Sequence, residues 1–159
     1  MKYYMTAAAV LLLDQVTKWL VLTKMDLYET IAVWKDVFHI TSHRNRGAAF
    51  GILQDQRWLF IVVTIAVVTA IVVYLARLGN SQPIMSWSLA LVLGGAVGNL
   101  IDRLRFAEVV DFFDFRWINY PIFNIADSAI VIGVGLMMWV TLRQPADADR
   151  VVNETGDSR

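Results

Sequence analysis

Four long apolar stretches alternate with shorter polar ones along this chain, at about residues 3–22, 58–76, 84–104 and 122–142. A helix that crosses a bilayer needs roughly 20 mostly apolar residues, each adding about 1.5 Å, and each stretch meets this requirement. The pattern predicts an integral membrane protein, mainly α, with four transmembrane helices. Because the number of crossings is even, both ends of the chain are expected on one side of the membrane.

The first apolar stretch has an alternative interpretation as a secretory signal peptide, because Lys2 precedes an apolar run. Asp14 and Lys18 interrupt this run, and no small-x-small cleavage pattern follows it. We therefore expect a permanent span.

The connections between the spans differ in length and character. Residues 77–83 contain Gly, Asn, Ser and Pro and predict a tight turn. Residues 23–57 contain IAVWKDVFHITSH, whose β-branched and aromatic residues predict two or three short strands at the membrane surface. Residues 1–145 are expected to form a single membrane-embedded domain, followed by a polar, disordered tail at 146–159.

The composition of the chain excludes several kinds of functional site. The residues are 57% hydrophobic and 18% charged, and 14 Lys+Arg balance 14 Asp+Glu, which argues against a nucleic-acid-binding polycation. The absence of cysteine excludes disulfides, thiolate zinc sites and cysteine nucleophiles. His39 and His43 could share a metal ion only on a helix, because four residues of a strand span about 13 Å, so no metal site is predicted.

Charged and amide side chains within the spans mark a candidate site, because such groups are costly in a membrane. They lie towards the same face of the membrane once the alternating direction of the spans is considered. The third connection, residues 105–121, carries Asp111 to that face. One site could thus be built from four pieces of chain; its polar span residues are Asp14, Lys18, Asn99, Asp102, Arg103, Asn124 and Asp127.

Asp111 and Asp127 are the pair with the clearest potential for catalysis. We place Asp111 just outside the fourth helix and Asp127 about 8 Å along it. Two carboxylates that share a poorly hydrated place cannot both ionise, so one would act as an acid and the other as a base towards water. Helix-end and surface acids without a catalytic role remain the alternative.

The other polar residues also have structural interpretations. Asn99, Asp102 and Arg103 share a helical face, and mutual satisfaction of Asp102 and Arg103 could fix the helices. Asp14 and Lys18 have i, i+4 spacing and could form a structural pair, or Lys18 could extend to the interface. A GxxxG motif at residues 94–98 predicts close helix packing.

The distribution of basic residues bears on orientation. With the termini inside, Lys2, Arg77, Arg143, Arg150 and Arg159 would be cytoplasmic. More basic residues would lie outside: Lys24, Lys35, Arg44, Arg46, Arg57, Arg105 and Arg116. The positive-inside rule alone therefore favours the opposite orientation.

Five blocks of sequence resemble a known family in order and spacing: LDQVTKW at 13–19, NRGAAFG at 45–51, GNLIDR at 98–103, EVVDF at 108–112 and FNIADS at 123–128. Together they resemble the bacterial lipoprotein signal peptidases, signal peptidase II. The resemblance implies four membrane helices and a small extracytoplasmic β-cradle, at about residues 28–53. It also implies a bacterial inner-membrane location with cytoplasmic termini, contrary to the charge count.

The resemblance further implies an aspartyl endopeptidase without a cofactor. Its dyad would be Asp111 and Asp127, and the residues lining or bracing the site would be Asp14, Asn45, Gly47, Ala48, Asn99, Asp102, Arg103, Asn124 and Ala126. The implied substrate is a diacylglyceryl-modified prolipoprotein, cut before the lipidated cysteine. Membrane lipids and globomycin-type inhibitors are further implied partners.

Two rival functions come from other classes. A proton-coupled carrier or channel subunit would also use intramembrane carboxylates, although no internal repeat is visible. A non-catalytic membrane assembly factor would need no facing carboxylates.

Overall fold

Four helices dominate the computed structural model, which describes residues 1–47, 55–78, 80–118 and 120–143. They are α1 (Lys2–Lys24), α2 (Arg57–Leu78), α3 (Pro83–Phe106) and α4 (Ile125–Arg143), and each is long and apolar enough to cross a membrane. The prediction of four spans is therefore confirmed. The fourth helix begins at Ile125 rather than at 122, because the backbone of Phe123 pairs with Phe113 and Asn124 precedes the helix as its cap.

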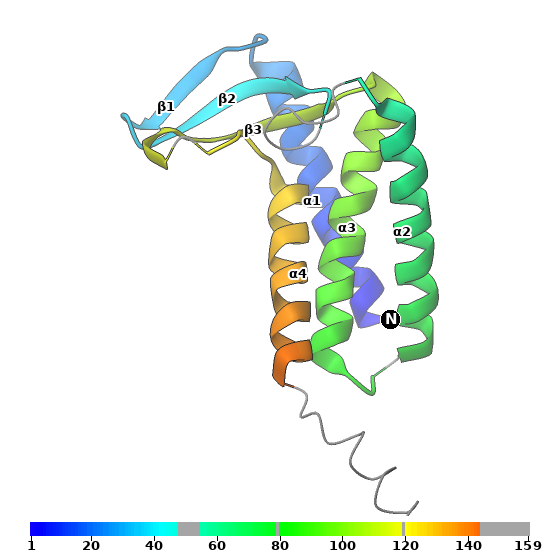
Figure 1. The fold of residues 1–159 in the computed structure, drawn as a ribbon. Helices are drawn as coiled ribbons and strands as arrows, with labels where there is room; N and C mark the ends of the chain where they lie inside the picture. Colours follow the sequence, from blue (N-terminus) through cyan, green and yellow to red (C-terminus); the bar gives the residue numbers. More distant parts are fainter. Residues whose placement is uncertain (48–54, 79, 119, 144–159) are drawn as a thin grey trace, which may run out of the picture.

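Helix α3 occupies the centre of the bundle and contacts the other three helices (Figure 1). In its most apolar 18-residue stretch 61% of the residues are buried, against 17 to 22% in the other helices. The remaining helices therefore leave most of their apolar surface outside the protein. Such surface is suited to contact with lipid.

Glycines allow α3 to approach its neighbours closely. A Cβ atom on Gly94 would lie 2.6 Å from the carbonyl oxygen of Ala7 in α1. A Cβ atom on Gly98 would lie 2.5 Å from Oδ2 of Asp14, and one on Gly95 would collide with the carbonyl oxygen of Ala126 in α4. The packing role predicted for the GxxxG motif is thus confirmed, since Gly94 and Gly98 both face α1.

A three-stranded antiparallel sheet covers one end of the bundle (Figure 1). Strands β1 (Thr30–Trp34) and β2 (Phe38–Asn45) come from the first connection, as predicted. The third strand, β3 (Val109–Phe115), lies outside the predicted range of 28–53 and pairs with β2. The sequence predicts only that the third connection carries Asp111. The paired residues of β2 and β3 lie far apart in the chain, from Asn45 with Val109 to Phe38 with Phe115, so the pairing has no local signal in the sequence.

The sheet is attached to α4 by aromatic side chains and by backbone hydrogen bonds. The ring of Phe115 stacks on that of Phe123, with 5.8 Å between centroids, and Phe113 lies 5.5 Å from the same ring. The N–H of Phe113 donates to the carbonyl oxygen of Phe123, and the N–H of Phe123 donates to the carbonyl oxygen of Phe113. The end of β3 and the start of α4 are consequently held together.

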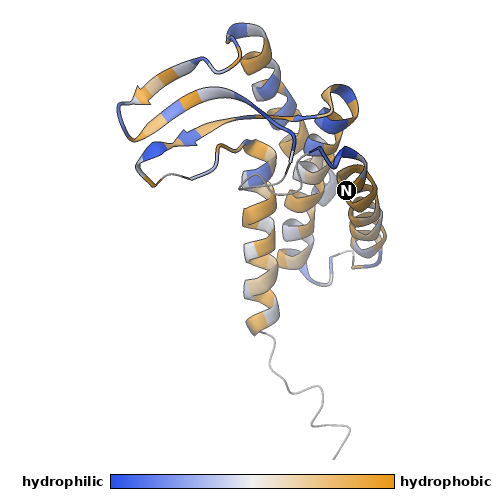
Figure 2. Ribbon diagram, turned by 45° about the horizontal axis from the view of Figure 1, so that its top comes forward, coloured by the Kyte–Doolittle hydropathy of each residue, from blue (hydrophilic) through white to orange (hydrophobic). Residues whose placement is uncertain are grey.

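The sheet lies at the end of the bundle opposite the first residue of α1 and the last residue of α4, and extends sideways beyond α4 (Figure 1). Figure 2 shows that polar residues gather in the sheet and at the adjoining helix ends, whereas the bodies of the helices are mainly hydrophobic. The candidate site lies where these two regions meet. The expected tail at 146–159 falls outside the described residues.

Candidate active site

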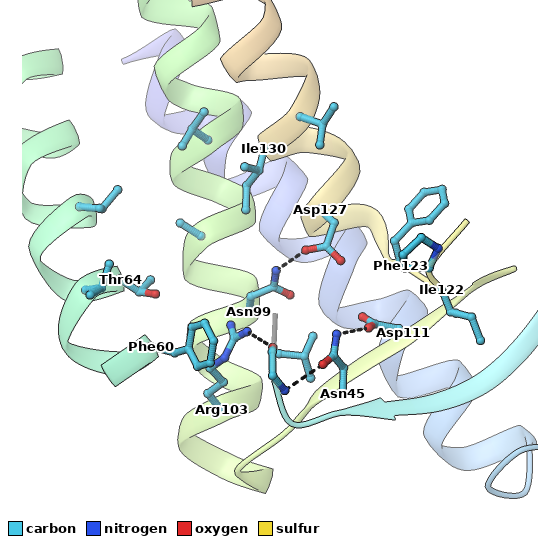
Figure 3. Close-up of a pocket in the computed structure, with 18 of the residues that line it drawn as sticks. Asn45, Phe60, Thr64, Asn99, Arg103, Asp111, Ile122, Phe123, Asp127 and Ile130 are labelled. Carbon is cyan, nitrogen blue, oxygen red and sulfur yellow. Dashed lines mark hydrogen bonds between the residues drawn. The ribbon is translucent and has the colours of Figure 1, made fainter. Parts of the chain in front are cut away.

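Asp111 and Asp127 both line one cavity beneath the sheet. Asp111 lies near the middle of β3, and Asp127 lies in the first turn of α4, rather than about 8 Å along it, because the helix begins later than expected. The cavity has a volume of about 410 Å³, and its walls come from α2, α3, α4, the end of β2, β3 and the connection between β3 and α4. Figure 3 shows both carboxylates directed into this cavity, that of Asp111 from β3 and that of Asp127 from α4.

Asn124 fixes Asp127 at the start of α4. The backbone N–H of Asp127 donates to Oδ1 of Asn124 over 2.9 Å, and the backbone N–H of Asn124 donates to Oδ2 of Asp127 over 3.3 Å. This is a reciprocal capping box in which aspartate takes the place usually held by glutamate or glutamine. The carboxylate therefore lies at the positive end of the helix dipole.

The same asparagine also holds the second carboxylate. Nδ2 of Asn124 donates to Oδ1 of Asp111 over 2.7 Å. Since its Oδ1 and backbone N–H serve Asp127, Asn124 links the two acids through one residue. The β3–α4 connection thus sets their relative position.

Asn45 and Gly47, both expected at the site, hold the other oxygen of Asp111. Nδ2 of Asn45 donates to Oδ2 of Asp111 over 3.0 Å. The backbone N–H of Gly47 donates to Oδ1 of Asn45 over 2.9 Å, so the amide group of Asn45 is turned towards the carboxylate (Figure 3). Ala48 lies outside the described residues.

Burial changes the acidity of Asp111, which is 1% exposed. Loss of hydration raises the pKa of this carboxyl to about 7, and the nearby charge of Asp127 acts in the same direction. The hydrogen bonds from Asn45 and Asn124 and the charge of Lys18 oppose this shift. Asp111 therefore retains its proton over a pH range in which an ordinary aspartate is ionised.

A second polar network lies behind the carboxylates, at the contact between α1 and α3. Nζ of Lys18 lies 2.9 Å from Oδ2 of Asp14 and 2.9 Å from Oδ2 of Asp102, and all three side chains are at most 2% exposed. Gln15 donates to both carboxylates. The pairing of Asp14 with Lys18 is confirmed, whereas extension of Lys18 to the interface is wrong, because its ammonium lies inside this network.

The network also braces the elements that carry the acids. Oδ1 of Asp14 accepts a hydrogen bond from the backbone N–H of Ala126 over 2.9 Å, at the first turn of α4. Oδ2 of Asp102 accepts one from the N–H of Val110 over 3.2 Å, next to Asp111. Asn99 continues the network from Lys18 to Asp127, with distances of 2.9 and 2.7 Å.

Arg103 does not pair with Asp102, contrary to the expectation from the sequence. Its guanidinium lies over the ring of Phe60, 4.6 Å from the centroid, and Nη2 lies 3.4 Å from the carbonyl oxygen of Gly47. Asp102 instead pairs with Lys18. The reason is geometric: Asp102 faces α1, and Arg103, one residue later, points into the cavity (Figure 3).

Gln15, Phe60 and Tyr120 are among the residues of the site that sequence reasoning missed. Gln15 is an amide within a span and directly follows Asp14, so its polarity was an available signal. Phe60 and Tyr120 line the cavity but resemble ordinary span and loop aromatics in the sequence. The two histidines both lie in β2, and the described residues contain no group of three metal-ligating side chains.

Comparisons with known proteins agree with this geometry. The profile of the signal peptidase (SPase) II family matches residues 6–143. A lipoprotein signal peptidase of Brevibacillus brevis is 57% identical over 138 residues, which cover 87% of this chain and 93% of that protein. One of Anoxybacillus flavithermus is 49% identical and covers 99% of this chain and 96% of that protein.

The fold is similar to that of a solved bacterial membrane enzyme, with a TM-score of 0.85 and 37% sequence identity over 92% of this chain and 90% of that one. The fold and the comparisons together define a multi-pass membrane peptidase. The chain belongs to the signal peptidase II family. This assignment favours a peptidase over the carrier and the assembly factor.

Proposed function

We propose that this protein is an intramembrane aspartyl endopeptidase that removes the signal peptide from diacylglyceryl-modified prolipoproteins, cutting before the lipidated cysteine. The observation that carries the mechanism is the placement of Asp111 and Asp127 in one cavity, linked by Asn124. The substrate class rests on the lipoprotein signal peptidases to which the chain is similar.

In the proposed reaction, the two carboxyl groups share one proton. Asp127 is ionised and takes a proton from water, while Asp111 is protonated and donates it to the oxygen of the scissile carbonyl. The water oxygen bonds to the carbonyl carbon and forms a tetrahedral diol. Asp127 then gives its proton to the departing nitrogen as the C–N bond breaks, and Asp111 recovers a proton from the diol.

The walls of the cavity suit a substrate that comes from the bilayer. Below the carboxylates they are apolar, formed by side chains of the three helices such as Val63, Val92 and Ile130. Each CH₂ buried there contributes about 0.8 kcal/mol, so a lipidated segment gains affinity that an unlipidated one lacks. Globomycin-type inhibitors would compete for this cavity.

We place the sheet and the carboxylates at the extracytoplasmic face of the bacterial inner membrane, and the termini in the cytoplasm. The excess of basic residues at the sheet end argues against this on charge alone. Several of these residues pair with acidic side chains of the protein: Arg44 and Arg46 lie near Glu108, and Arg116 pairs with Asp114. The proposed orientation rests on the resemblance to the family and not on the distribution of charge.

The orientation can be tested by labelling, because the chain contains no cysteine. Val33→Cys in the exposed strand β1 should react with a membrane-impermeant maleimide in intact cells whose envelope outside the inner membrane has been permeabilised. Ser81→Cys, in the turn between α2 and α3, should react only after lysis. The reverse pattern would contradict the proposed orientation.

The activity is tested by incubating the purified protein with a diacylglyceryl-modified prolipoprotein and locating the cut by mass. Cleavage before the modified cysteine is expected, and EDTA should not reduce it, because carboxylates alone activate the water. The unlipidated precursor is the matched control and should have a much lower kcat/KM. Equal values for the two substrates would contradict lipid recognition, and metal-dependent cleavage would contradict the dyad.

A further inference from the structure

Lys18 forms a link to the candidate catalytic pair, although its ammonium does not contact either acid of that pair in the described structure. Its Nζ atom lies 2.9 Å from oxygens of Asp14, Asp102 and Asn99. An ammonium has three hydrogens and no acceptor, so these three oxygens use its full donor capacity. The side chain is 2% exposed and cannot exchange these partners for water.

This arrangement fixes the orientation of Asn99, whose Oδ1 accepts a hydrogen bond from Lys18 over 2.9 Å and a longer one from Nδ2 of Asn124 over 3.2 Å. Because Lys18 can only donate, it contacts the Oδ1 end of the amide, and the Nδ2 end must point away from it. Nδ2 lies 2.7 Å from Oδ1 of Asp127, the shorter of the two hydrogen bonds that this carboxylate accepts. A donor held in this position favours the ionised form of the acid.

Other charged groups surround Asp127 as well. Asp14 and Lys18 approach from α1, Arg103 from α3 and Asp111 from β3, and Asp102 of α3 lies behind them as a partner of Lys18. Of the cations in this set, Lys18 is joined to Asp127 by an unbroken pair of hydrogen bonds, through Asn99. Asp111 is also joined to Asp127, through Asn124. Asp111 instead accepts its side-chain hydrogen bonds from the neutral amides of Asn45 and Asn124.

We propose that Lys18 is a positioning residue that assigns the negative charge of the dyad to Asp127, by holding the NH₂ group of Asn99 towards that carboxylate. The inference rests on the proposed aspartyl mechanism. Without Lys18, Oδ1 of Asn99 keeps only the longer contact with Nδ2 of Asn124, at 3.2 Å, and the amide can turn its oxygen towards Asp127 and favour the protonated form of the wrong acid.

The test is the pH profile of kcat/KM for the full-length enzyme acting on a diacylglyceryl-modified prolipoprotein. In Lys18→Met, the acidic limb should move to higher pH by about one unit, because Asp127 has lost a donor that favours its ionised form. Activity should therefore fall more at pH 5.5 than at pH 8. A residue with only a structural role would lower activity by the same factor at every pH.

A second variant guards against misfolding, since Lys18→Met leaves Asp14 and Asp102 without a counterion. Lys18→Met combined with Asp14→Asn removes one charge of each sign, and the new amide can still accept from the N–H of Ala126. A shift of the acidic limb in the same direction is expected, because this variant also lacks the ammonium that orients Asn99. The matched control is Gln15→Leu, which removes hydrogen bonds to the same two carboxylates but does not contact Asn99.

The control should lose thermal stability without a shift of the limb. An unshifted limb in the charge-balanced double variant, with cleavage retained, would overturn the role of Lys18 and leave the proposed peptidase function intact. A shift of equal size in Gln15→Leu would also overturn it. Absence of cleavage by the wild-type protein would overturn the function and this inference together.

Discussion

Asn124 and Asp127 exchange two hydrogen bonds at the start of α4, each giving a backbone N–H to the side chain of the other. Because Asn124 also donates to Asp111, a residue that caps a helix is at the same time the connection between two candidate catalytic acids. Helix stability and catalytic geometry therefore depend on the same side chain. Substitutions at position 124 can separate these two contributions.

Asn124→Ser should retain the cap, since serine is a good N-cap residue, but it removes the donor to Asp111. Asn124→Ala removes both and should cost about 1 kcal/mol more in unfolding free energy. Both variants should lose most of their kcat. The two variants are distinguished by thermal unfolding in detergent, measured together with turnover of lipidated substrate. A fully active Asn124→Ser variant would show that the link to Asp111 is dispensable.

Asp111→Asn and Asp127→Asn keep the size of the side chain and remove the titrating group. Each should reduce cleavage by at least about 10³-fold, within the range for loss of a general acid or base. The double variant should be no worse than either single one, because losses among residues that act as a unit are not additive. The control is membrane insertion, which is measured by cell fractionation and should be the same as in the wild type. Near-normal turnover by either single variant would refute the dyad and make Asp102 or Asp14 the next candidate.

The pH dependence of the reaction should show the raised pKa of Asp111, about 7. The mechanism needs this carboxyl protonated, so kcat should fall as the pH rises above about 7. The apparent value belongs to the coupled pair rather than to one residue. Turnover of lipidated substrate measured from pH 5 to 9 checks this, and a constant rate from pH 6 to 9 would contradict it.

The same carboxyl should make the protein less stable as the pH rises. The folded state keeps the proton of Asp111 up to about pH 7, whereas the unfolded chain loses it near the ordinary value of 3.8. The contribution of this carboxyl to the free energy of unfolding is therefore fully present below about pH 4. It is lost as the pH rises towards about 7. Asp111→Asn cannot ionise and should be more stable than the wild type at pH 8, but not at pH 4. Thermal melts at both values test this.

Gly98 and Gly135 provide a matched pair for the close packing of the helices. A Cβ atom at Gly98 would lie 2.5 Å from Oδ2 of Asp14, whereas one at Gly135 meets nothing within 4 Å among the described residues. Gly98→Ala should cost about 1–3 kcal/mol, because it displaces a carboxylate that pairs with Lys18. Gly135→Ala should leave stability unchanged or raise it by about 0.5 kcal/mol. Equal thermal stabilities would show that the contact relaxes freely.

The four helices could be predicted because hydropathy is a local property of the sequence. Strand β3 could not, since its partner β2 is distant and VVDFFDF lacks a clear polar face. Its residues 109–112 are all buried, so no alternation of polar and apolar side chains was available to indicate a strand.

The site shows the same division between local and tertiary information. The i, i+4 spacing indicated the pairing of Asp14 with Lys18 correctly, because both residues lie on one helix. The partner of Asp102 lies on a different helix, and sequence proximity suggested Arg103 instead of Lys18. The bridging role of Asn124 likewise needed β3 and α4 to be placed together. The catalytic assignment of Asp111 and Asp127 stays a prediction.

Helix α4 is the last element that the structure describes, and it contributes to both polar networks of the site. It carries Asp127, its second N–H group satisfies Asp14, and the residue before its cap joins β3. During synthesis, a chain that has inserted only the first three helices holds Asp111 without its partner acid. If Asp111 and Asp127 form the proposed dyad, competence for hydrolysis arises only when the final helix docks, and a chain in the membrane that lacks α4 is inert.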